Sequence, residues 1–179
     1  MRLWLFIGLC FIAGNAMADA YAFIGLNQMR VSVDGKGAQK EDWGATLGGG
    51  YRFTPHLAAE ISYAYGHVAE GEARIIEWSS RNLGIAAVGT LAFRTRVSAI
   101  GRAGLQRMVG RWNHTLRSGS SSTRLEPEIG WTGWVPSLGL GAQCTIDKRH
   151  AIRAMAELTG GVDGLKDSRS LSVTAVIFF

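Results

Sequence analysis

The residues of this chain that could do chemistry are charged side chains at alternate positions of segments built mostly from apolar and small residues. Arg52 and Glu60 stand on either side of a Thr-Pro-His turn, and Arg153 and Glu157 lie four residues apart in another segment. Successive side chains of a strand point to opposite faces, so residues of one parity share a face. An isolated buried charge is costly, so charges enclosed together must pair or contact trapped water. The predicted polar and ion-pair network comprises Arg52, Glu60, Arg102, Arg153, Glu157 and Gln143.

The four histidines are the other candidates for chemistry. His67 lies near acidic residues in a polar segment, His114 lies in a Ser-rich segment, and His56 and His150 lie at turns. Nucleophilic catalysis needs a nucleophile and a base that the fold holds in a fixed geometry. No histidine here stands in such a pattern. We therefore predict no enzyme and no catalytic, cofactor or metal site, with a lipid A-modifying enzyme as an alternative.

Period-two alternation supplies the elements that must position the charged residues. In the last segment the odd positions Leu171, Val173, Ala175 and Ile177 are apolar, whereas the even positions begin with serine and threonine. Alternation of this kind is typical of a strand with two different faces. The same pattern predicts eight strands, over residues 19–33, 43–53, 57–65, 82–93, 97–109, 134–146, 151–158 and 171–179. The parity of the first strand is left open.

The connections between these strands alternate between long polar segments and short turns. Residues 34–42, 67–80, 112–132 and 160–168 are predicted to be loops, and 112–132 is the longest irregular segment. Trp43, Trp134 and the other tryptophans after residue 18 fall at the long-loop end, whereas Phe53, Phe93, Phe178 and Phe179 fall at the short-turn end. Even strand number, short turns on one side and two aromatic girdles are typical of bacterial outer-membrane barrels. We therefore predict an all-β fold, an eight-stranded antiparallel up-and-down transmembrane β-barrel.

The N-terminal residues and the composition indicate export. Arg2, an apolar run and an Ala-Met-Ala site predict a cleaved signal peptide over residues 1–18, which leaves residues 19–179 as the barrel domain. Only Cys144 then remains, so no internal disulfide can form. The formal net charge of +5 is too small to indicate a nucleic-acid partner. A soluble periplasmic β-protein is the alternative to an outer-membrane location.

The chain resembles the membrane domain of outer membrane protein A and its small barrel relatives. The resemblance runs from about Tyr21 to Phe179 and is strongest at Gly49-Gly50-Tyr51-Arg52-Phe53, Glu60-Ile61-Ser62-Tyr63, Ala151-Ile152-Arg153 and the closing phenylalanine. It implies an interior ion-pair network in which Glu60, Arg102 and Arg153 match family members. Thr90 and Gln143 depart from it, because the family has Lys and Glu there. The resemblance also implies that Phe179 is the signal read by the outer-membrane assembly machinery, with a simple girdle aromatic as the alternative.

The expected function is a structural or surface-interaction (adhesin-like) role through the extracellular loops. Arg111, Arg117 and Arg124 make the segment around 112–132 basic, which suits polyanionic lipopolysaccharide or a host or cell-surface ligand. We expect outer-membrane lipid as the surroundings and a monomer as the assembly. A narrow gated pore through the polar lumen is the first alternative function.

Overall fold

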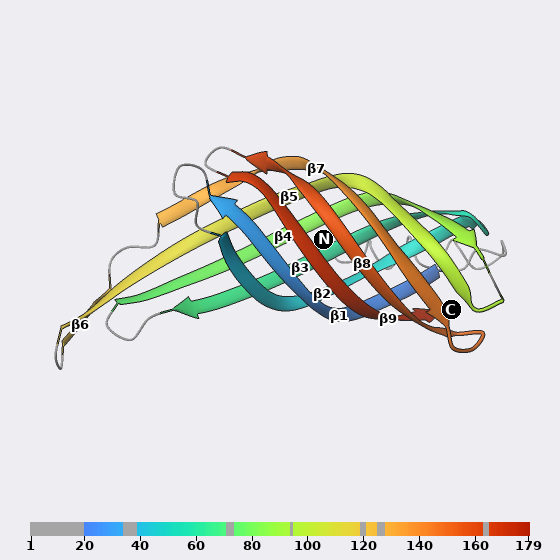
Figure 1. The fold of residues 1–179 in the computed structure, drawn as a ribbon, viewed down its shortest axis with the longest axis horizontal. Coiled ribbons are helices and arrows are strands. Elements are labelled where there is room, and N and C mark those ends of the chain that lie inside the picture. Colours follow the sequence, from blue (N-terminus) through green and yellow to red (C-terminus); the bar gives the residue numbers. More distant parts are fainter. Residues whose placement is uncertain are drawn as a thin grey trace, which may run out of the picture.

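The computed structural model describes residues 20–33, 39–70, 74–93, 95–118, 121–124, 128–162 and 165–179. All regular structure in this part of the chain is β-strand (Figure 1). The strands are β1 Ala20–Val33, β2 Gln39–Thr54, β3 Leu57–Glu70, β4 Arg74–Ala92, β5 Val97–Ser118, β6 Ser121–Arg124, β7 Glu128–Thr145, β8 His150–Val162 and β9 Leu165–Phe178. No helix in the described ranges is long and apolar enough to span a bilayer.

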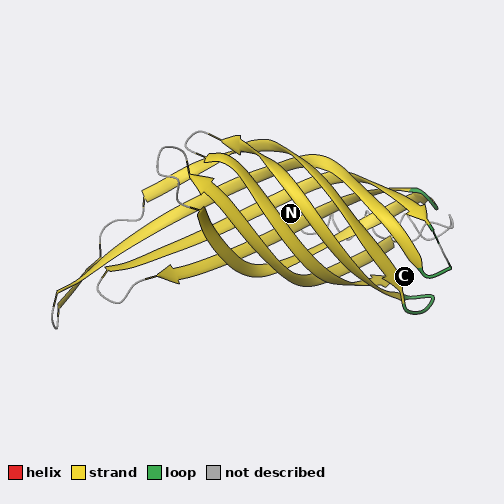
Figure 2. Cartoon of the chain, in the orientation of Figure 1, coloured by secondary structure: helices red, strands yellow, loops and turns green. Residues whose placement is uncertain are grey.

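Eight of these strands close into an antiparallel barrel (Figure 2). The order around the wall is β4-β3-β2-β1-β9-β8-β7-β5, and pairing of β4 with β5 closes the ring. The short β6 pairs only with β5 among the described strands and belongs to the hairpin between β5 and β7. The prediction of an eight-stranded up-and-down barrel is therefore confirmed. The closed ring leaves no unpaired edge within its wall, which is what a hydrocarbon environment demands.

The strands are staggered as they pass around the wall. Paired residues lead from Ala20 through Tyr51 and Ala59 around the ring to Arg169, which pairs with Arg30. One circuit therefore returns to β1 ten residues further along the strand. A stagger of this kind tilts the strands against the barrel axis and sets the diameter, and at eight strands the interior holds side chains rather than a wide channel.

The two faces of the strands differ as the alternation predicts. Outward side chains such as Leu138 and Leu140 are exposed, with Leu140 at 75 %, whereas inward Val88 and Val176 are each only 1 % exposed. In β1 the inward residues are Phe23 and Asn27, which decides the parity that the sequence leaves open. A large exposed apolar surface around a closed ring is what lipid contact requires. Cys144 is exposed on the outer face.

The predicted loops are wrong in their extent. β2 already begins at Gln39, β3 continues to Glu70 and β4 begins at Arg74. Most of the segment predicted as irregular, 112–132, belongs to β5, β6 and β7. The reason is that ladder hydrogen bonds join main-chain groups, so paired strands can continue into polar sequence without any alternation. Of the predicted loop at 160–168, residues 160–162 belong to β8 and residues 165–168 to β9, and residues 163–164 lie outside the described residues.

The aromatic girdles are confirmed in part. Trp43 and Trp134 lie exposed toward the long-hairpin end, and Phe53 and Phe93 lie exposed at the short-turn end. The prediction that Phe178 belongs to the girdle is wrong, because its even position turns its side chain inward. Its ring centroid lies 5.7 Å from that of Tyr21. The side chains of the other three tryptophans after residue 18 lie outside the described residues.

Candidate functional site

The lumen holds a cluster of charged side chains centred on Glu60, which β3 turns inward and which is 5 % exposed. Its Oε1 atom accepts hydrogen bonds from Arg153 Nη1 on β8 and from the hydroxyl of Tyr21 on β1, at 2.7 Å. Its Oε2 atom lies 3.4 Å from Arg102 Nε on β5. This contact is electrostatic, because Arg102 Nε makes no hydrogen bond within the described residues. Glu60 therefore joins residues from four strands.

Arg102 links Glu60 to a second carboxylate, Glu157 on β8. Arg102 Nη1 donates to both carboxylate oxygens of Glu157, at 2.9 and 2.7 Å, and Arg102 Nη2 donates to the Ser62 hydroxyl at 2.7 Å. The amide of Gln106 also donates to Glu157. Because Nη1 is held by both oxygens of Glu157 and Nη2 by Ser62, the guanidinium is fixed in orientation as well as in position.

Most of the predicted network residues meet in one cluster. Gln143 Oε1 accepts from Arg153 Nε at 3.3 Å and from Arg153 Nη2 at 3.2 Å, so five of the six lie in one connected cluster. The guanidinium carbon of the sixth residue, Arg52, lies 4.7 Å from the centre of the Phe178 ring. The cluster holds two arginines and two glutamates, so its charges balance. Balance is necessary because desolvation of an unpaired ion costs on the order of several kcal/mol.

Three members of the cluster were not predicted. Ser62 and Gln106 have the inward parity of their strands, so their strand patterns contain the signal. Tyr21 could be assigned only once the parity of β1 was known. Its partner Glu60 is 39 residues away in sequence, and no local pattern joins the two.

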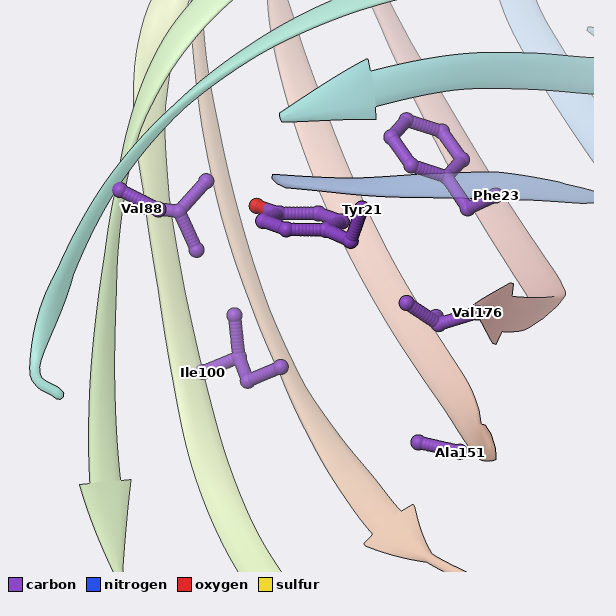
Figure 3. Close-up of a cluster of buried hydrophobic side chains, with 7 residues drawn as sticks. Tyr21, Phe23, Val88, Ile100, Ala151 and Val176 are labelled. Atoms are coloured by element: carbon purple, nitrogen blue, oxygen red, sulfur yellow. The ribbon is translucent and has the colours of Figure 1, made fainter. Parts of the chain in front are cut away.

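An apolar plug, which is a cluster of buried side chains, lies inside the barrel beside the charged cluster. Its buried core comprises Tyr21, Phe23, Ala58, Val88, Ile100, Ala151 and Val176. These residues come from the strand ends near the short turns, and Figure 3 shows the labelled side chains converging on the barrel interior. The plug excludes water on that side, which strengthens the neighbouring ion pairs.

Two glycines of β2 allow the plug to form. A Cβ atom at Gly50 would lie 2.3 Å from Tyr21 Cζ, and one at Gly48 would lie 2.4 Å from Phe23 Cζ. The two rings therefore lie against bare backbone. This close approach explains the run Gly48-Gly49-Gly50 without any phosphate-binding role.

A polar cavity of about 60 Å³ lies on the other side of the charged cluster. Its lining includes Asn27, Asn82 and Arg102, each of which has a buried polar atom without a partner within the described residues. A cavity of this size is large enough for a few water molecules, and buried polar atoms without protein partners are the usual ligands of such waters. Asn82 Nδ2 also contacts Met29 Sδ at 3.5 Å, on the side away from the plug. The lumen is thus layered into an apolar plug, an ion-pair cluster and a polar cavity.

The extension beyond the barrel wall is built from β4, β5, β6 and β7. β5 has 22 residues, about twice the ~10 that a tilted strand needs to cross a bilayer. Arg111 pairs with Ile129 of β7, and Arg117 pairs with Ser122 of β6 in the backbone register. Arg124 pairs with Thr115. The side chains of these three arginines lie outside the described residues.

One edge of this extension has no ladder partner among the described residues. β7 pairs with β5 from Trp112↔Glu128 to Val97↔Cys144. It pairs with β8 only from Ser137↔Thr159 to Thr145↔Ala151. The β8 side of β7 is therefore unpaired from Glu128 to Pro136.

The short-turn end carries the remaining candidates. Asp147 accepts hydrogen bonds from the backbone N–H groups of Arg149, at 2.7 Å, and His150, at 2.9 Å, and its carboxylate lies 3.0 Å from His150 Nδ1. The ring of His56 contacts the carbonyl oxygen of Thr90 at 3.1 Å. Phe179 is 79 % exposed, and its N–H donates to the Ala20 carbonyl. The side chains of His67 and His114 lie outside the described residues.

A closed eight-stranded ring with a polar, ion-paired interior and an apolar exterior defines a small outer-membrane barrel. The family model of the outer membrane protein beta-barrel domain matches residues 5–177, and the chain belongs to this family. The protein is located in the outer membrane. A search of curated protein sequences finds no significant match.

Solved structures with the same fold include two barrels with low sequence identity. Ail, the attachment invasion locus protein of Yersinia pestis, has a TM-score of 0.65 at 19 % identity, over 90 % of this chain and 99 % of Ail. Neisserial surface protein A has a TM-score of 0.63 at 15 % identity, over 89 % of this chain and 95 % of the other. Ail was also solved in complex with the heparin analogue sucrose octasulfate, with a TM-score of 0.64 at 19 % identity, over 90 % of this chain and 99 % of Ail. At these identities the likeness concerns the fold.

Proposed function

We propose that this barrel is a surface-interaction protein that binds an anionic ligand through the extension of β5 and its partner strands. The observation that carries the proposal is the continuous pairing of β5 beyond the length needed to cross the membrane. Short turns face the periplasm in barrels of this kind, so the extension stands on the extracellular side. A paired ladder holds a binding surface in a defined place above the membrane.

The ligand chemistry follows from the charges on this extension. Arg111, Arg117 and Arg124 lie on β5 and β6, and their positive charge favours sulfated or phosphorylated polymers. The structure of Ail with a heparin analogue supports this class of ligand for a barrel of the same fold. Cell-surface polysaccharide and lipopolysaccharide are the two sources of such a polymer that the proposal admits.

Heparin binding to the purified barrel in nanodiscs tests the proposal. The triple variant Arg111→Ala/Arg117→Ala/Arg124→Ala should bind about tenfold more weakly, because it removes three positive charges and an ionic contact at a protein surface is worth up to about 1 kcal/mol. The matched control Arg96→Ala/Lys148→Ala/Arg149→Ala removes the same charge at the periplasmic turns and should bind as the wild type does. Equal binding by the first variant and the wild type would refute the proposal.

The unpaired edge of β7 favours a second mode, strand addition by a protein ligand. Unpaired N–H and C=O groups from Glu128 to Pro136 can accept an extended peptide, and main-chain bonds then supply the affinity. Amide hydrogen exchange distinguishes the modes. Heparin should leave the exchange of the edge amides unchanged, whereas an added strand should slow it.

The alternatives of a pore and an enzyme have less support. The apolar plug weighs against a conduction path past Arg102 and Arg153. His150 and Asp147 form an exposed pair in a periplasmic turn, where nothing in the described ranges provides a nucleophile beside them. Both barrels with the same fold described above are named for attachment or for the cell surface.

The processing of the chain is part of the proposal. We propose that residues 1–18 are a signal peptide and that Phe179 acts as the assembly signal. Intact-mass spectrometry of the protein extracted from outer membranes should give a chain that starts at Asp19. A mass that includes residues 1–18 would contradict the cleavage.

A further inference from the structure

A groove of about 970 Å³ runs across the outer wall of the barrel from β4 to β1. Its floor includes the small residues Ala87, Gly89, Gly101, Ala103 and Ala156, and its lining also includes Leu138, Leu140, Leu158 and Leu171. It follows the hydrogen-bonding direction, because Ala87 pairs with Ala103, Ala103 with Leu138 and Leu138 with Leu158. Five strand spacings of about 4.8 Å give it a length of about 24 Å.

The stagger of the strands makes this groove rise through the membrane. Gly89 and Gly101 lie near the periplasmic ends of β4 and β5, whereas Arg30 lies near the extracellular end of β1. The groove therefore begins in the apolar belt and ends at the extracellular boundary of the outer leaflet. An acyl chain enters such a depression from the side, since the wall here faces lipid.

Two arginines stand at the upper end of the groove. Arg30 of β1 and Arg169 of β9 are directly opposite each other in the ladder, and their side chains are 56 % and 73 % exposed. Like charges in this position repel and destabilise the pair. Arg30 Nη2 forms an ion pair with Glu41 Oε1 at 2.5 Å. Arg169 Nε lies 3.9 Å from Asp167 Oδ2, which is a much weaker contact. The guanidinium of Arg169 thus retains donors for an external anion.

We propose that this groove is a binding site for a phosphate-bearing lipid of the outer leaflet. The lipid phosphate lies between Arg30 and Arg169, and one acyl chain lies along the small-residue floor. Arginine suits this role, because its planar fork matches phosphate oxygens and its charge persists at any membrane pH. Phosphate neutralises the repulsion between the two arginines, and the floor gives the chain apolar contact. The inference rests on the outer-membrane location and does not depend on the extracellular ligand proposed above.

Native mass spectrometry of the intact barrel in a zwitterionic detergent tests the site. Phosphatidic acid and diacylglycerol with the same acyl chains are the two probes. The wild type should bind phosphatidic acid at least about tenfold more tightly, a difference of about 1.4 kcal/mol. Arg30→Ala/Arg169→Ala should abolish this preference. The matched control Arg81→Ala/Arg107→Ala removes two exposed outward arginines that do not line the groove, and it should keep the preference within about twofold.

A second pair of variants tests the acyl part of the site. The nearest atom to a Cβ at Gly89 or Gly101 lies 4.0 Å away, so Gly89→Leu and Gly101→Leu fill the groove without a clash against the wall. Each should weaken phosphatidic acid binding several-fold, and added inorganic phosphate should displace little lipid from the wild type. The proposal is overturned if the Arg30/Arg169 variant keeps the preference, if the Arg81/Arg107 variant loses it equally, or if both leucine variants bind as the wild type does. Retention of the folded gel mobility by each variant separates these outcomes from misfolding.

Discussion

Glu60 is the residue on which the lumen depends most, because two arginines and a tyrosine contact one carboxylate. Its burial makes ionisation costly, and the surrounding donors offset that cost. The network is therefore sensitive to the loss of one charge. Removal of one partner leaves the others buried and unpaired, which costs more than the pair itself contributes.

Glu60→Gln should lower the free energy of unfolding by about 3–5 kcal/mol, because Arg153 then lacks its carboxylate. Urea unfolding of the barrel in lipid vesicles measures the change. Glu41→Gln is the matched control, since it breaks an exposed ion pair with Arg30 and should cost no more than about 1 kcal/mol. Equal effects of the two substitutions would show that burial of the network contributes little.

The contacts of Asp147, in the turn between β7 and β8, predict that its contribution to the stability of the fold depends on pH. The backbone N–H of Arg149 and the ring of His150 stabilise the carboxylate and hold the pKa of Asp147 below its ordinary range. A carboxyl with a lowered folded-state pKa stabilises the fold above its unfolded pKa, and this contribution is lost as the pH falls through the folded value. The Tm of wild type should exceed that of Asp147→Asn at neutral pH. The difference should vanish below the ordinary aspartate range, and a difference that is constant with pH would contradict the assignment.

The faces of a strand and its length have two separate physical causes. The faces follow from the alternation of side chains, and the length follows from main-chain pairing. β5 shows the distinction, because its alternation is clear to Val109 whereas its pairing with β4 continues to Leu116. The extension is thus a continuation of the same paired strands that form the barrel wall.

Leu140→Arg tests the lipid contact of the outer face. Leu140 is the sixth residue from the end of the 18-residue β7 and lies in the apolar belt. A charge near the midplane should destabilise the barrel by about 2–4 kcal/mol. The control Val97→Arg places the charge at the first residue of β5, near the periplasmic boundary, where about 0–1 kcal/mol is expected. Unfolding in lipid vesicles measures the loss of stability for both variants. Equal losses would show that Leu140 does not lie near the midplane of the membrane.

The whole molecule combines an interior filled by side chains with an asymmetric exterior. Closure of β4 on β5 removes the free edges from the wall, and the plug fills one end of the lumen. The other end carries the extension with the unpaired edge of β7. Figure 1 shows this asymmetry, with the extended strands and β6 at one end and the C-terminus at the other. Both proposed interactions, with an anionic ligand and with a lipid, therefore lie at the extended end and on the outer wall.

Planar-bilayer recordings test the closed interior. The wild type should give no conductance steps, because the apolar plug and the ion-pair cluster lie in series along the lumen. Glu60→Ala leaves the plug in place and should also be silent. Steps in the wild type that disappear in Glu60→Ala would instead support a gate built from the ion pairs.

The sequence by itself determined the membrane barrel and the two faces of its strands. Alternation is a local property, so eight strands with inward Glu60 and outward Leu140 could be predicted before any pairing was known. The tertiary structure decided which inward residues meet, because Glu60 and Arg153 lie 93 residues apart and only the stagger of the strands brings them together. It also decided the length of β5 and the placement of Arg30 opposite Arg169, since side-chain periodicity fixes which face a residue takes but leaves register shifts of two residues and the extent of pairing open.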